Sequence, residues 1–169
     1  MSILRTLSIA LSGAAMLALA QPALAEQTWP TPEETARAFK VICLDNPGDQ
    51  KTQARIATSA PWSLVKSKDS DDKRVYYDKF PWQVTLTKTE SGLHICAVTT
   101  GAPGETSDAQ ARTAAIKVLS PRPADIENEE GGFSWTFKNG GLEYLVLYQM
   151  QTFENEGNPL TVISYGLSW

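Results

Sequence analysis

The chain has 169 residues and a formal net charge of −4 at pH 7. This length is enough for one domain whose hydrophobic core can fold without help from other chains. The mildly acidic balance and the lack of a basic cluster argue against nucleic acid and against anionic membrane surfaces. We therefore expect no nucleic-acid partner.

The first 25 residues have the pattern of a cleaved signal peptide. Arg5 supplies a positive start, Leu7 to Ala20 is an apolar run, and Ala23-Leu24-Ala25 is an A-x-A cleavage site. No second long apolar run follows, so we expect no transmembrane segment after the signal is removed. Taking 25 residues from 169 leaves 144, and residues 26–169 are predicted to form a single domain in the periplasm or outside the cell.

The chain contains two cysteines, Cys43 and Cys96. In an exported protein an isolated pair of cysteines predicts a disulfide bond between them. The alternative is a pair of redox-active or metal-ligating thiols. The sequence has no C-x-x-C motif, which would lower a thiol pKa and favour that alternative.

Two helices are predicted before the first long strand. Thr31-Pro32-Glu33-Glu34 is typical of a helix start, with threonine as N-cap and Glu34 closing a capping box. The buried face of this helix is predicted to hold Ala36, Phe39, Ile42 and Cys43. A second helix is expected from Asp49 to about Ala60, with a buried side made of Ala54, Ile56, Ala57 and Ala60.

The middle of the chain predicts a β-hairpin. Residues 76–88 and 93–100 alternate in period two and are rich in β-branched and aromatic residues. Gly92 suits the turn between them. Pro81 cannot donate a ladder hydrogen bond, so we expect it at a strand start or a bulge.

The rest of the chain predicts a third helix and a β-meander. Ser107 is expected to cap a helix from Asp108 to Leu119, and an acidic loop is expected at 125–132. Strands are predicted at 133–138, 142–153 and 160–169. Together the elements predict an α+β fold, with an antiparallel sheet and about three helices packed on one face. The disulfide would tie the first helix to the central strand.

Motifs for chemistry are sparse. His94 is the only histidine and shares a strand face with Cys96. A Cys–His pair needs a free thiol and a group that orients the ring, and zinc needs four ligands. Asp69 starts an acidic run, but the glycine and glutamate of a calcium loop are replaced by Arg74 and Phe80. We expect no catalytic residue, no metal site and no cofactor.

The dense aromatic run in the hairpin is the best functional signal. Tyr76, Tyr77, Trp82 and His94 are predicted to form a possible binding surface, because such rings join apolar area to a polar group. The first hypothesis is a non-enzymatic binding protein with a protein partner in the cell envelope, inhibitor-like or immunity-like in role. The alternatives are a small hydrolase or thiol enzyme centred on His94, and a structural envelope protein.

Overall fold

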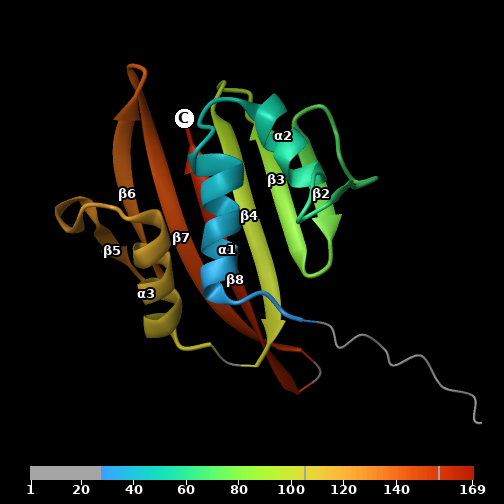
Figure 1. Cartoon of the computed structure of the whole chain (residues 1–169), viewed down its shortest axis with the longest axis vertical. Coiled ribbons are helices and arrows are strands. Elements are labelled where there is room, and N and C mark those ends of the chain that lie inside the picture. The colour runs from blue at the N-terminus through green and yellow to red at the C-terminus, as the bar shows by residue number, and fades with distance from the viewer. Residues whose placement is uncertain (1–27, 105, 156) are drawn as a thin grey trace, which may run out of the picture.

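The structure is a computed structural model that describes residues 28–104, 106–155 and 157–169 (Figure 1). The predicted signal peptide lies outside the described residues. The helical elements are α1 (Pro32–Phe39), the π-helical turn η1 (Lys40–Leu44), α2 (Gln50–Thr58), α3 (Asp108–Leu119) and the 3₁₀ turn η2 (Pro123–Asp125). The strands are β1 (Val65–Lys66), β2 (Arg74–Lys79), β3 (Trp82–Lys88), β4 (His94–Pro103), β5 (Glu127–Glu129), β6 (Gly132–Asn139), β7 (Leu142–Asn155) and β8 (Asn158–Ser168).

All of these strands belong to one antiparallel sheet in the order β1-β2-β3-β4-β8-β7-β6-β5. Strands β1 to β4 form a meander. The chain then passes through α3 to the far edge and returns as a second meander, which ends with β8 paired to β4 at the centre (Figure 1). The α+β class and the antiparallel sheet are confirmed.

The start of α1 has the predicted capping box. The Thr31 hydroxyl accepts a hydrogen bond from the Glu34 backbone N–H, and the Glu34 carboxylate accepts one from the Thr31 backbone N–H. After Phe39 the helix widens into the π-helical turn η1 and does not continue as α-helix to Cys43. The predicted buried face is nevertheless fully buried: Ala36, Phe39, Ile42 and Cys43.

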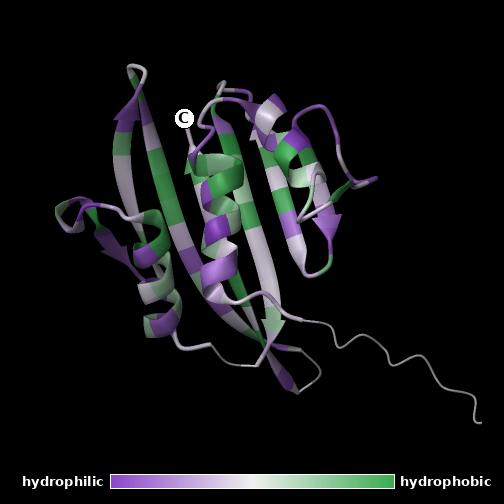
Figure 2. Ribbon diagram, viewed as in Figure 1, coloured by the Kyte–Doolittle hydropathy of each residue, from purple (hydrophilic) through white to green (hydrophobic). Residues whose placement is uncertain are grey.

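The core lies between the helices and one face of the sheet, here named the core face. The Phe39 ring stacks on Tyr165 with centroids 5.4 Å apart, and the hydroxyls of Thr35 and Thr100 are 2.9 Å apart. Figure 2 shows apolar and polar residues alternating along the strands, as expected when one face is buried. The fully buried strand positions on the core face include Val84, Cys96, Val98, Tyr165, Leu167, Val146, Tyr148 and Phe133.

Arg112 fixes α3 to the same face. Its guanidinium lies 5.2 Å from the centroid of the Phe133 ring. It also donates 2.7 Å hydrogen bonds to the Gly132 carbonyl and to the Asn128 side-chain oxygen. Both α1 and α3 therefore contact the core face and lie in front of the sheet in Figure 1. That all three helices cover this one face stays a prediction.

Several predicted boundaries were wrong. Residues 76–88 form two strands, because the chain turns at Phe80 and Pro81, and a proline cannot continue a ladder. The loop predicted at 125–132 contains the strand β5 and begins at the last residue of η2. Helix α2 ends at Thr58, which leaves Ala60 exposed.

The predicted disulfide bond between Cys43 and Cys96 is present, and both residues are fully buried. It joins η1 to Cys96 near the start of β4, with a sequence separation of 53 residues. Such a cross-link restricts the unfolded chain more than the folded one. It is compatible with an oxidising compartment.

We predict that reducing this disulfide lowers the free energy of unfolding by about 4 kcal/mol, the value expected for a loop of this length. Urea unfolding with and without reductant measures the loss. The Cys43→Ala/Cys96→Ala double variant is the control, and its stability should not respond to reductant. Equal stability of the oxidised and reduced forms would contradict the prediction.

Candidate functional site

The four residues predicted to form a binding surface lie on two faces of the sheet. Tyr77 pairs with Val84, and Trp82 pairs with Thr100, so both belong to the core face. Both are partly buried against the core. Tyr76 pairs with Thr85 and lies on the opposite face. The four rings therefore do not gather into one surface, and their role in binding stays a prediction.

His94 lies at the end of β4 on the core face. Its ring stacks on Trp169 with centroids 5.5 Å apart, and the two residues exchange backbone hydrogen bonds. The sulfur of Cys96 is bonded to Cys43, so it cannot serve as the nucleophile that a thiol enzyme centred on His94 would need. Among the described residues, no group of three or more His, Cys, Asp or Glu side chains is placed to hold a metal ion.

Two buried tyrosines lie under the helices on the core face. The rings of Tyr148 and Tyr165 are 5.3 Å apart, and both residues are fully buried. Burial is the main cause that raises the pKa of each phenol above its usual value. Both hydroxyls therefore remain neutral at physiological pH, and the pair is best understood as packing.

The opposite face of the sheet carries a surface that the sequence reasoning missed. Its residues alternate with the buried ones along the central strands. We name as the charge-free face the outward positions of β3 (Gln83, Thr85, Thr87), β4 (Ile95, Ala97, Thr99, Gly101, Pro103), β8 (Leu160, Val162, Ser164, Gly166, Ser168) and β7 (Leu145, Leu147, Gln149, Gln151, Phe153). None of these side chains is charged, although charged residues make up 20% of the chain. Glu143 also points outward from β7, but it lies at the strand end, beyond the pairing with β8.

Gly166 lies on β8, a central strand of the charge-free face, and is paired with Ala97 on one side and Leu147 on the other. Along the strands it stands near one end of the face, one row from Ile95 and Ser168. A Cβ added at Gly166 would meet no heavy atom of the described structure within 4 Å. Larger apolar side chains lie along β7, with Leu145 44% exposed and Phe153 49% exposed. The described structure therefore leaves the face uncovered at Gly166.

The strands β2 and β5, beyond the charge-free face, carry charged side chains at outward positions. On β2, Arg74 and Asp78 point to the same side of the sheet as Thr87 and Gln83, their pairing partners. Glu127 of β5 lies in line with the outward residues at the other edge. An uncharged centre with a charged rim is the arrangement of protein–protein interfaces, where charged residues are depleted from the core of the contact.

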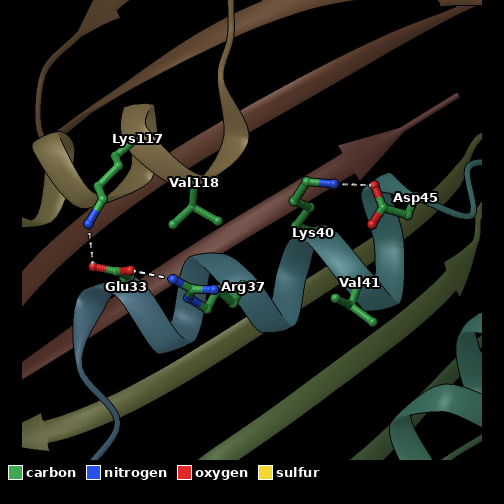
Figure 3. Close-up of a pocket in the computed structure, with 7 residues that line it drawn as sticks. All are labelled: Glu33, Arg37, Lys40, Val41, Asp45, Lys117 and Val118. Carbon is green, nitrogen blue, oxygen red and sulfur yellow. Dashed lines mark hydrogen bonds and ion pairs between the residues drawn. The ribbon is translucent and has the colours of Figure 1, made fainter.

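A groove between α1 and α3 is a second candidate (Figure 3). It has a volume of about 460 Å³ and is lined by Glu33, Arg37, Lys40, Val41, Asp45, Lys117 and Val118. Glu33 accepts hydrogen bonds from Arg37 at 2.6 Å and from Lys117 at 3.2 Å, and so ties the two helices together. The sequence pattern gave no signal for this groove, because it depends on the packing of two distant helices.

The charges of the groove largely neutralise one another. Hydrogen bonds from Arg37 and then Lys117 lower the pKa of the Glu33 carboxyl, so it stays ionised. The Lys40 Nζ lies 2.5 Å from the Oδ1 atom of Asp45. Each of the three cations has a carboxylate partner, but Arg37 and Lys117 share Glu33, so the lining side chains keep a net charge of only about +1.

Comparisons with protein-family models, with curated proteins and with solved structures find no match. The assignment of a site therefore depends on the geometry of this chain alone. Within the described part of the chain, no helix has both the length and the apolar character needed to cross a membrane. Of the two candidates, the charge-free face spans four strands, and no described residue covers it at Gly166.

We predict that Trp82→Ala lowers the free energy of unfolding by about 2 kcal/mol, because the ring is partly buried against the core. Phe80→Ala is the matched control: Phe80 is 69% exposed, and its loss should change stability by less than about 0.5 kcal/mol. Chemical denaturation measures both. Equal stability losses would show that the Trp82 ring does not belong to the core.

We also predict that Glu33→Gln removes part of the pH dependence of stability. The pKa of Glu33 is lowered in the folded chain, so its stabilising effect is present at neutral pH and disappears as the carboxylate is protonated in acid. The difference in melting temperature between the two proteins should shrink as the pH falls. A difference that stays constant with pH would contradict the stabilising contacts of Glu33 with Arg37 and Lys117.

Proposed function

We propose that this protein is an exported, non-enzymatic binding module that holds a protein partner on the charge-free face. Export is supported by the signal-peptide pattern and by the buried disulfide. The observation that carries the proposal is the run of outward positions without charge across four adjacent strands. A sheet face that remains in water normally carries charged and polar residues at such positions.

The shape of the face favours a protein over a small molecule. Four strands about 4.8 Å apart and some ten residues long span roughly 600 Å², close to the roughly 800 Å² that one partner contributes to a standard interface. The groove described above lies elsewhere, between α1 and α3, and a hollow of about 320 Å³ that Tyr76, Asp78 and Gln83 help to line lies at the β2 border of the face. Threonine, serine and glutamine offer hydrogen bonds, and Leu145 and Phe153 offer apolar anchors.

The arrangement of the helices is part of the proposal. With α1 and α3 held on the core face, we propose that α2 also lies there and leaves the opposite face open. The hydrolase hypothesis has less support, because the ring of His94 is stacked on Trp169 at the end of the core face. A general base needs an accessible nitrogen and a nucleophile within hydrogen-bond reach.

The test places a large charged side chain on β8, within the charge-free face. Gly166→Arg has room in the folded chain, since no described atom lies within 4 Å of the new Cβ, and it is expected to keep the fold. Gln110→Arg, on the exposed surface of α3, is the matched control. Melting temperature confirms that both variants are folded.

Binding is read out by a photoreactive phenylalanine analogue placed at Gln149 on the charge-free face. In the native exported fraction it should cross-link to a protein partner, while the same probe at Gln110 should not. Gly166→Arg should reduce the cross-linked product at least tenfold, and Gln110→Arg should leave it unchanged. Absence of product from Gln149, or product that persists with Gly166→Arg, would refute the proposal.

A further inference from the structure

We infer that the partner on the charge-free face is a second copy of this chain, related by a two-fold axis that crosses the strands at the level of Gly166. This inference rests on the proposed function and names its partner. It follows from the way in which the register of the sheet places small residues and charges about that level.

The residues at the level of Gly166 form one continuous row across the sheet. The pairing runs from Tyr76 through Thr85, Ala97 and Gly166 to Leu147. The middle of this row is small and uncharged. Two copies can therefore approach face to face, as the two sheets of a sandwich do, without bringing like charges together.

Arg74 and Asp78 give this face a self-complementary charge pattern. They flank Tyr76 by two residues on either side, on the same strand and the same face. A two-fold axis across the strands at Tyr76 reverses the direction of the partner strand. Arg74 of each copy then faces Asp78 of the other, so the contact contains the same ion pair twice, as an isologous interface requires.

Both side chains are available for this contact. The Arg74 guanidinium lies 3.3 Å from the Tyr76 hydroxyl, and the Asp78 carboxylate accepts a 3.1 Å hydrogen bond from Gln83. Neither belongs to an ion pair within the described residues. Arg74 is exposed and Asp78 is partly exposed, at the border of the charge-free face.

The remaining charge at this level lies outside the contact. Glu127 of β5 aligns with Ser134 and Leu147 but is separated from the charge-free face by β6. Twisted sheets that pack face to face separate at their outer corners.

The test is a charge-reversal cycle on the full exported chain with its disulfide intact. Sedimentation equilibrium of the wild type should show a dimer. Arg74→Asp places two carboxylates opposite each other, and Asp78→Arg places two cations opposite each other, so each is expected to weaken the dimer roughly tenfold. The double variant Arg74→Asp/Asp78→Arg should restore wild-type affinity, because the pair is re-formed in the opposite sense.

Arg122→Asp is the matched control, because it reverses the charge of an exposed side chain next to η2. This variant should leave the dimer affinity unchanged. Melting temperatures exclude unfolding as the cause of dissociation. Single reversals that weaken the dimer without rescue by the double variant would overturn the two-fold arrangement. A dimer that persists in the Gly166→Arg variant would also overturn the two-fold arrangement.

A wild-type chain that is monomeric at millimolar concentration overturns the inference. The cross-linking from Gln149 then separates the two failures. If the probe captures a different exported protein, the proposed function stands and only the identity of the partner is wrong. If it captures nothing, both the proposed function and the second-copy inference are refuted.

Discussion

The arrangement depends first on the covalent tie between Cys43 and Cys96. It anchors the helical segment α1–η1 near the start of β4, and β4 is hydrogen-bonded to β8 at the junction of the two meanders. One bond therefore holds the N-terminal helix against the strand pair that joins both halves of the sheet. The stacking of Phe39 on Tyr165 extends this contact to β8. Both α1 and α3 are held on the core face by such contacts.

Much of this fold is predictable from local patterns. The capping box at Thr31 and the burial of Cys43 follow from spacing within one helix, and both are present. The division of residues 76–88 into β2 and β3 was missed because Pro81 turns the chain inside an otherwise regular alternation. The pairing of β4 with β8 joins residues far apart in the sequence, and no local pattern encodes such a contact.

The candidate site, like the fold, could be predicted only in part from local patterns. Period-two alternation predicts that Tyr76 and Tyr77 point to opposite faces, and the register agrees. Alternation does not say which face is covered, so it could not separate core aromatics from surface ones. The sequence did contain a signal for the charge-free face: neither β4 nor β8 has a lysine, arginine, aspartate or glutamate. That signal acquires meaning only when the two strands are known to be neighbours.

The placement of charge on the sheet distinguishes its edges from its face. A sheet that must avoid association protects itself with charges, short edge strands or a covering layer. The edges here follow this rule, because β1 has two residues, and β5 has three, two of them the exposed glutamates Glu127 and Glu129. Among the described residues, the charge-free face carries no charged side chain, and no atom covers it at Gly166. Short or charged edge strands discourage association at the edges of the sheet, whereas an uncharged face permits it. This difference between edges and face is what the proposed binding through the face requires.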